Sequence, residues 1–196
     1  MTSKEMTLKT GERLTVRQPD LEHDLEALLG FLSNLPEQDR LFMRYDVTEG
    51  ETLRKRLSQI DSEDHFRIIV EIDGKIVGDA TLDRELHGWS RHMAQLRGVV
   101  TPEYREKGVA TILFRELSVI AEEVAIEKLF AEVMGDNAAV IETLKKAGFT
   151  HEATLARFAK DIHGRYHDLH IMTNDLSLVW KRLEDQLLLM DIQMPG

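Results

Sequence analysis

The chain has 196 residues, of which 35 are acidic and 25 are basic, so its formal net charge is −10 at pH 7. With 42% hydrophobic residues it can bury a sizeable core, which excludes a disordered or collagen-like chain and predicts one globular domain. The absence of cysteine excludes a disulfide scaffold and a thiol nucleophile, and the net acidity argues against a nucleic-acid partner, whose phosphates are bound by clustered Lys and Arg.

The first half of the chain alternates between helix and strand signals. Thr48 and Glu51 have the spacing of a capping box at the start of a helix, and Asp73-Gly74 is a two-residue hairpin signal between two apolar runs. The expected elements are a strand over 14–18, a helix over 20–35, a helix over 48–60, and strands over 66–72, 75–82 and 93–100. The last three strands are expected to form an antiparallel meander.

The second half has the pattern of a parallel crossover. A helix between two strands of this length joins parallel neighbours, and Gly148 suits the left-handed position that ends a helix. The expected elements are a helix over 107–123, a strand over 128–134, a helix over 137–147, strands over 153–161 and 165–172, and a C-terminal helix over 177–190. The predicted class is therefore α/β, with a mixed sheet, a closing hairpin and a C-terminal helix.

The turn Arg105–Ala110 between a strand and a helix is the most informative segment. The first N–H groups of a helix lack internal partners and lie at the positive end of its dipole, so they can bind a diphosphate. Gly108 would let a phosphate approach without meeting a Cβ. The small residues could equally serve close packing of the helix on the strand. Neither the P-loop pattern G-x-x-x-x-G-K-[ST] nor the dinucleotide pattern G-x-G-x-x-G occurs in the chain.

Arg105–Ala110 resembles the R/Q-x-x-G-x-G/A signature of the GNAT N-acetyltransferase superfamily. Asn137–Phe149 resembles a second motif of that family, N-x-x-[AS]-I followed by Gly-Phe, with Asn and Phe twelve residues apart. The order of strands and helices over residues 13–173 follows the family. The resemblance implies a GNAT domain over residues 1–176, a helical extension over 177–196, and acetyl-coenzyme A as co-substrate.

The resemblance also implies which residues hold the cofactor. The main-chain amides of the turn would bind the diphosphate, the preceding strand would pair with the pantetheine arm, and Asn137 would hydrogen-bond the pantetheine. The backbone N–H of Val100 would bind the thioester carbonyl as part of catalysis. The implied cofactor-binding residues are Val99, Val100, Arg105, Glu106, Lys107, Gly108, Val109, Ala110 and Asn137.

The chain departs from the family at two catalytic positions. Gln95 stands where many members have a basic Glu, and Leu144 stands where many have a Tyr that protonates the departing thiolate. An acceptor amine must lose a proton, because a lysine-like amine is neutral in only about one molecule in 10³ at pH 7. Glu132 is the preferred candidate base, with Asp79 and His92 as alternatives, although each also fits an ordinary polar position on a sheet.

No metal site is expected. The three histidines His163, His167 and His170 lie within eight residues, but His167 and His170 would point to opposite faces of a strand. Trp89 is expected either at the border of the acceptor pocket or in a satellite of the core.

The leading hypothesis is an acetyl-coenzyme A-dependent N-acetyltransferase that acts on a primary amine, in a protein or a small molecule, by direct attack in a ternary complex. The alternative is a catalytically silent acyl-coenzyme A sensor or adaptor with the same fold. The apolar residues of the tail helix either form a homodimer or partner surface or pack on the domain. With no apolar signal region and no run of the roughly 20 apolar residues of a membrane span, we expect a cytoplasmic protein with no membrane partner.

Overall fold

The computed structural model describes residues 3–41, 43, 47, 50–57, 63–135 and 137–177. Its elements are β1 (Lys4–Thr7), β2 (Arg13–Arg17), α1 (Leu21–Ser33), α2 (Glu37–Arg40), α3 (Gly50–Leu57), β3 (His65–Ile72), β4 (Lys75–Arg84), β5 (Met93–Val100), the 3-10 helix η1 (Pro102–Tyr104), α4 (Val109–Glu123), β6 (Lys128–Met134), α5 (Ala138–Lys146), β7 (Thr150–Lys160) and β8 (Tyr166–Asp175). The described strands form one sheet in the order β1-β2-β3-β4-β5-β6-β8-β7. Within it β5 and β6 run parallel, while the other neighbouring pairs run antiparallel. The predicted meander, parallel crossover and closing hairpin are confirmed.

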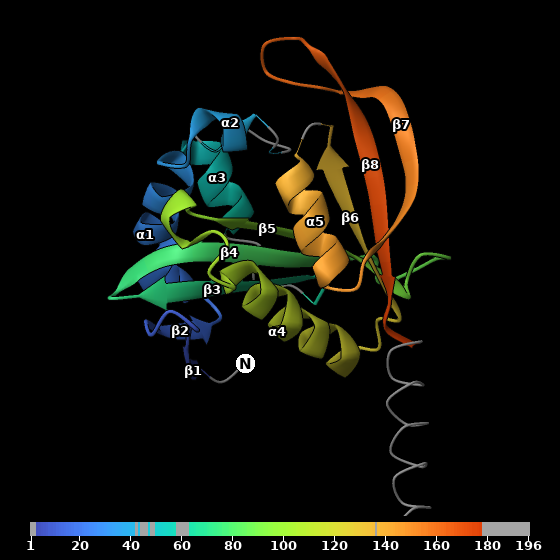
Figure 1. Cartoon of the computed structure of the whole chain (residues 1–196). Helices are drawn as coiled ribbons and strands as arrows, with labels where there is room; N and C mark the ends of the chain where they lie inside the picture. The colour runs from blue at the N-terminus through green and yellow to red at the C-terminus, as the bar shows by residue number, and fades with distance from the viewer. Residues whose placement is uncertain are drawn as a thin grey trace, which may run out of the picture.

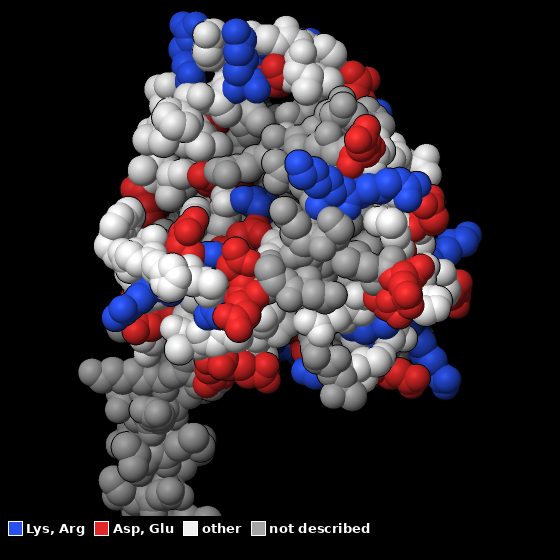
Figure 2. Space-filling view, turned by 180° about the vertical axis from the view of Figure 1, so that it is seen from behind, with Lys and Arg blue, Asp and Glu red and all other residues white. Residues whose placement is uncertain are grey.

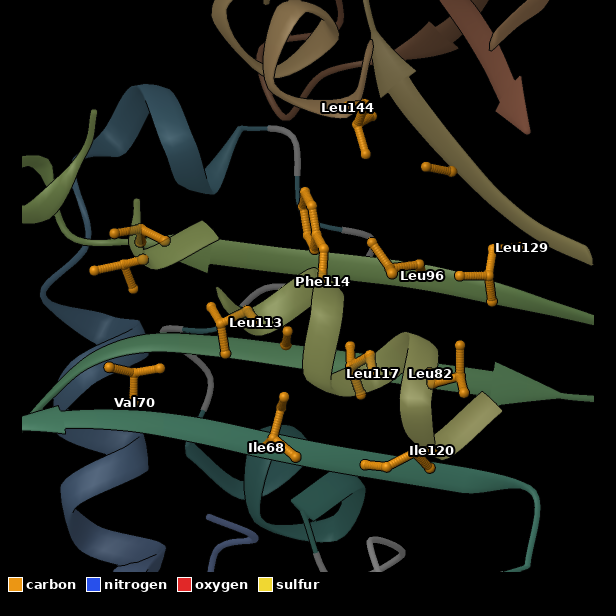
Figure 3. Packing of buried hydrophobic residues seen from close by; sticks show 14 of the residues in the cluster. Ile68, Val70, Leu82, Leu96, Leu113, Phe114, Leu117, Ile120, Leu129 and Leu144 are labelled. Atoms are coloured by element: carbon orange, nitrogen blue, oxygen red, sulfur yellow. The ribbon is translucent and has the colours of Figure 1, made fainter. Parts of the chain in front are cut away.

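Helices cover both faces of this sheet, with α4 and α5 on one side and α1 and α3 on the other (Figure 1). The α4 helix packs along the sheet because its apolar residues recur every three or four positions and face the strands. Figure 3 shows Leu113 and Leu117 of α4 lying over Ile68 and Leu82, all of them fully buried. Each such side chain stabilises the fold by about 1.5–3 kcal/mol relative to an exposed one.

A second apolar cluster lies on the opposite face, under α1. Leu28 and Leu32 of α1 pack there with Ile69 of β3, and Val99 of β5 contacts the same cluster. Val100 belongs to the α4-side core instead, because successive residues of a strand point to opposite faces. The C-terminal end of β5 is thus fixed from both sides of the sheet.

Local signals in the sequence set the turns and the ends of helices. Asp73 and Gly74 have φ angles of 50° and 72° in the β3–β4 turn, the left-handed conformation that a two-residue hairpin needs. Asp20 caps α1 by accepting a hydrogen bond from the N–H of Glu22 at 3.0 Å. Gly148 has a φ of 91° after α5, as the C-terminal glycine of a helix should.

The structure also contains elements that the sequence did not predict. The short strand β1 and the four-residue helix α2 are additions, β7 begins three residues before its predicted start, and β8 ends three residues after its predicted end. The predicted cap at Thr48 and the predicted helix over 177–190, apart from its first residue, lie outside the described residues. The domain boundary at residue 176 therefore stays a prediction. Among the described helices, none is long and apolar enough to cross a bilayer.

The carboxylate of Asp161 organises the turn between β7 and β8. Its Oδ1 accepts hydrogen bonds from the N–H groups of His163 and Arg165, both at 2.9 Å, and its Oδ2 lies 2.9 Å from Nε2 of His167. These bonds, with His167 contributing most, lower the pKa of Asp161 to about 2. The ionised carboxylate therefore stabilises the folded chain at pH values above its unfolded pKa of about 3.9, and this contribution is lost as the pH falls through about 2.

We expect Asp161→Asn to lower the thermal unfolding midpoint at pH 6, because the amide oxygen is a weaker acceptor and the pairing with His167 is lost. The difference between wild type and variant should shrink as the pH falls from 4 to 2, measured by circular dichroism melts. Asp73→Asn, a matched change in the β3–β4 turn, is the control and should leave the unfolding midpoint nearly unchanged at pH 6. A pH-independent difference for Asp161→Asn would contradict this account of the turn.

Candidate active site

The parallel strands β5 and β6 separate halfway along their length. They pair only from Met93 to Gln95 on β5, opposite Lys128 to Phe130 on β6. Beyond that point β5 continues to Val100 beside β4, and β6 continues to Met134 beside β8. The two strands diverge there, as Figure 1 shows. One edge of β5 is thus left facing a gap in the sheet.

The backbone of β5 presents N–H groups toward this gap. The N–H of Thr101 donates to the carbonyl of Val77 at 2.9 Å, on the β4 side. Because residues alternate along an antiparallel ladder, the N–H groups of Gly98 and Val100 point the other way, toward β6. A ligand lying along this edge would find backbone donors at the regular spacing of a strand.

The loop after β5 leads directly into the N-terminus of α4. Glu106 and Gly108 have φ angles of 63° and 96°, and α4 begins at Val109, with no acidic residue in its first turn. The first N–H groups of α4 are therefore directed out of the helix without a competing carboxylate there. No heavy atom lies within 4 Å of a Cβ built on Gly108, so the protein itself requires glycine here for its φ angle.

These features border one open cleft of about 2020 Å³. Of the predicted site residues, those that line it are Val99, Val100, Arg105, Glu106, Gly108, Ala110, Glu132 and Asn137. The side chains of Lys107 and Val109 turn elsewhere: Val109 is fully buried in the core, and Lys107 pairs with Glu12. The predicted roles of Lys107 and Val109 involve their main-chain N–H groups, and these roles are compatible with the observed positions of the two side chains.

Side chains of the loop are held by neighbouring elements. Nζ of Lys107 lies 3.0 Å from Oε1 of Glu12 and 4.7 Å from the centre of the Tyr104 ring. Hydrogen bonds from Thr10 and from Lys107 lower the pKa of Glu12 to about 2. Arg105 donates to the carbonyl of Val100 at 3.2 Å and pairs with Asp39 of α2, which ties the loop to the helix on the opposite side of the cleft.

Asn137 lies at the N-terminus of α5, where its Oδ1 accepts a hydrogen bond from the N–H of Val140 at 3.4 Å. The carbonyl oxygen of this side chain is therefore used in capping. A hydrogen bond from Asn137 to a ligand in the cleft would be donated by its amide nitrogen.

Among the candidate bases, Glu132 has the most suitable place. It lines the cleft on β6, and its Oε2 accepts a hydrogen bond from Nε2 of Gln95 at 3.0 Å. Asp79 also lines the cleft but is buried and bound by both Nε and Nη2 of Arg67, at 2.7 and 3.0 Å. His92, immediately before β5, is not among the described residues that line the cleft.

Leu144 and Trp89 lie in different surroundings. Leu144 is 2% exposed and lies in the core between α5 and the sheet (Figure 3), so no proton donor stands at that position. The expectation that Trp89 lies in a satellite of the core was wrong, while a place at the border of the acceptor pocket stays a prediction. Trp89 lies in the β4–β5 loop with 86% of its surface exposed, and it is not among the described residues of the cleft.

The histidines of the closing hairpin make separate contacts. His167 pairs with Asp161, while His163 crosses to Glu37 of α2 at 3.2 Å. His170 lies 3.1 Å from His151 on the neighbouring strand. Among the described residues, no group of three or more His, Asp or Glu side chains is arranged to hold a metal ion.

A polar track on the α1 face of the sheet was missed by sequence reasoning. Every second residue of β4 from Asp79 to Asp83, and of β5 from Gln95 to Arg97, is polar, although the strands are central. The signal available in the sequence for this track was a polar residue at every second position of strands that also carry buried apolar residues. Figure 2 views the molecule from the side of α1 and α3, where acidic and basic side chains lie close together near the centre of the view.

The model of the acetyltransferase (GNAT) family matches residues 32–149, and the chain belongs to this family, whose members use acetyl-coenzyme A. The chain is similar to the L-amino acid N-acetyltransferase AaaT of Escherichia coli, with 30% identity over 107 residues, 54% of this chain and 65% of the relative. It is also similar to the acetyltransferase Pat of Mycolicibacterium smegmatis, with 28% identity over 148 residues, 72% of this chain and 42% of the relative. These matches span less than two thirds of either relative.

Solved structures share the fold. The ribosomal-protein-alanine N-acetyltransferase of Brucella melitensis is 26% identical, with a TM-score of 0.73 over 82% of this chain and 99% of that one. The yncA protein of Salmonella typhimurium, solved with its cofactor acetyl-CoA, is 20% identical, with a TM-score of 0.70 over 83% of this chain and 94% of that one. The second likeness, at this identity, concerns the fold alone.

Proposed function

We propose that this protein transfers an acetyl group from acetyl-coenzyme A to a primary amine, by direct attack in a ternary complex. The observation that carries the proposal is the separation of β5 from β6 beside the N-terminus of α4. That arrangement offers an extended strand edge and a row of outward helix N–H groups in one cleft, which suits a long ligand with a diphosphate in its middle.

The protein would hold two parts of such a ligand in different ways. The N–H groups from Lys107 to Ala110 would bind the diphosphate, and three or four hydrogen bonds to a charged acceptor stabilise it by roughly 1.5–3 kcal/mol each. The strand edge at Val99 and Val100, with Asn137 across the gap, would bind the pantetheine arm. Arg105 and Glu106 would border the diphosphate at the entry to the loop.

Acetyl-coenzyme A supplies an activated acetyl thioester when bound. The N–H of Val100 would donate a hydrogen bond to its carbonyl oxygen, where negative charge develops during transfer. Glu132 would take the proton of the attacking amine, directly or through water, because a primary amine is almost wholly protonated at neutral pH. With Leu144 buried, the departing thiolate would recover its proton from water, which a pKa of about 8.5 allows.

The acceptor would enter from the face that carries α1, α2 and α3, where Glu132 and the polar track lie. A protein amine and a small amine both remain within the proposal, and the net charge of −10 favours a cationic acceptor through long-range attraction. The cytoplasmic location and the homodimer expected from the sequence stay predictions.

The presence of Gln95 and Leu144 at the two catalytic positions of the family favours one alternative, a silent acyl-coenzyme A sensor. Release of free thiol from acetyl-coenzyme A, measured with a panel of small amines, amino acids and lysine peptides, separates the two. We expect amine-dependent thiol release, with the acetylated amine detected in equal amount by mass spectrometry. Saturable cofactor binding without thiol release across the panel would support the sensor and contradict the enzyme.

A further inference from the structure

We propose that Gln95 is a positioning residue that holds Glu132 ready to accept a proton. This inference deepens the proposed function and rests on it. Gln95 belongs to a chain of side-chain contacts that crosses four strands on the α1 face of the sheet. We call this set of residues the cross-strand chain: His65 on β3, Asp83 on β4, Arg97 and Gln95 on β5, and Glu132 on β6.

The contacts of the cross-strand chain are continuous. Nε2 of Gln95 donates to Oε2 of Glu132 at 3.0 Å, and Oε1 of Gln95 accepts from Arg97. Arg97 also pairs with Asp83, which pairs with His65. The strand register places these residues on one face, since Asp83 is opposite both His65 and Gln95. Each member is therefore fixed by the next.

The chemistry of Arg97 sets the orientation of the Gln95 amide. A guanidinium group has donors and no acceptor, so the oxygen of Gln95 must face it. The amide nitrogen then faces Glu132 and donates to it. Glu132 accepts this bond through Oε2, so Gln95 fixes the direction in which the carboxyl group points. Gln95 is only 6% exposed, and water competes little for this bond.

The charged side chains near Gln95 and Glu132 are paired with opposite charges. Burial alone would raise the pKa of Asp83, but the hydrogen bond from His65 and the positive charges of His65, Arg97 and Arg67 hold the pKa below its usual value. Asp83 therefore stays ionised and keeps Arg97 in place. From the other side, β8 sets the apolar Ile171 opposite Glu132. The buried Arg67–Asp79 pair lies on the same face of the sheet.

A glutamine at position 95 thus takes part in catalysis without carrying a proton. The residue cannot act as a base, yet it can restrict the carboxylate of Glu132 to one rotamer. Loss of one hydrogen bond to a charged group corresponds to a change of roughly tenfold or more in rate. The general base would then lie on β6, whereas many family members have it on the neighbouring strand β5, and the residue at that β5 position would support it.

The test compares Gln95→Leu with wild type in two measurements. We expect kcat to fall about tenfold with an unchanged KM for acetyl-coenzyme A. In the free protein at neutral pH, the side-chain ¹³C carboxyl signal of Glu132 should differ from that of wild type, because its hydrogen bond from residue 95 is lost. Asn174→Leu is the matched control. It removes a buried amide that donates to Ala147 on the other face, and it should change neither kcat nor the Glu132 signal.

A second variant, Gln95→Glu, keeps an acceptor for Arg97 but places a carboxylate beside Glu132. The like charges would repel each other in place of the lost hydrogen bond, so kcat should fall and the Glu132 carboxyl signal should again differ from wild type. An unchanged Glu132 carboxyl signal in folded Gln95→Leu or in Gln95→Glu would overturn the positioning role. Absence of thiol release by wild type would instead refute the proposed function, while the carboxyl signal of the free protein would still report whether Gln95 holds Glu132.

Discussion

Replacement of Glu132 by glutamine is expected to lower kcat/KM for the amine acceptor by about 10²- to 10⁴-fold, the range that a positioned general base contributes. The substituted amide keeps the size of the side chain and its place on β6, but it cannot take a proton. The acidic limb of the wild-type profile should disappear, because the remaining rate would no longer require an ionised carboxylate at this position. Steady-state thiol release between pH 6 and 9 measures both effects.

Glu127→Gln is the matched control for this experiment. Glu127 is an exposed glutamate immediately before β6, outside the described lining of the cleft, and its replacement should leave rate and profile unchanged. Binding of acetyl-coenzyme A should be the same in Glu132→Gln and in wild type. A Glu132→Gln enzyme with wild-type kcat/KM and an unaltered pH profile would exclude Glu132 as the base.

Replacement of Gly108 by valine is expected to weaken coenzyme A binding by about 100-fold or more. A β-branched residue strains a φ of 96°, and a left-handed conformation costs an L residue about 1–2 kcal/mol. Relaxation of that strain would turn the first N–H groups of α4 away from the diphosphate. Loss of two hydrogen bonds of roughly 1.5–3 kcal/mol each corresponds to about two or more decades in Kd. Isothermal titration calorimetry measures this directly.

Gly88→Val provides the comparison. Gly88 has a φ of 86° and, like Gly108, no heavy atom within 4 Å of a built Cβ, but it lies in the β4–β5 loop away from the cleft. Both variants should lose similar amounts of stability in thermal melts, and only Gly108→Val should lose affinity. Equal affinity in the two variants would mean that the loop before α4 does not bind the diphosphate.

Local features of the fold were predictable because their causes lie within a few residues. The left-handed turn at Asp73-Gly74, the cap at Asp20 and the glycine after α5 each depend on side chains at fixed offsets. The apolar stripe of α4 and the strand–helix–strand order similarly predicted the parallel pairing of β5 with β6. Short elements without such signals, β1 and α2, were missed.

The working geometry of the site depends on residues far apart in the chain, and the sequence contained no comparable signal for it. The divergence of β5 from β6 after Gln95 depends on how each strand pairs with its other neighbour. The contact of Gln95 with Glu132 joins residues 37 apart. Sequence reasoning treated Gln95 as a lost base and Glu132 as an isolated carboxylate, whereas the structure brings them into one hydrogen bond.

The reason for a glycine at position 108 also changed once the backbone was known. Sequence reasoning attributed it to the approach of a phosphate, but the φ of 96° requires glycine in the protein alone. Trp89 shows a limit of reasoning from residue type. Burial in a satellite of the core was one expectation for this large aromatic residue, but it is exposed on a loop. Residue type predicts burial poorly where no periodic pattern surrounds it.

Titration of the ¹⁵N-labelled wild-type protein with acetyl-coenzyme A, followed by amide NMR spectra, tests the central claim most directly. We predict saturable changes at one equivalent, concentrated at the amides of Gly98 and Val100 and of residues 107–110, with little change at Gly88. A folded protein whose spectrum does not change at millimolar acetyl-coenzyme A would contradict the assignment of this cleft, as would saturation with changes confined to other parts of the chain.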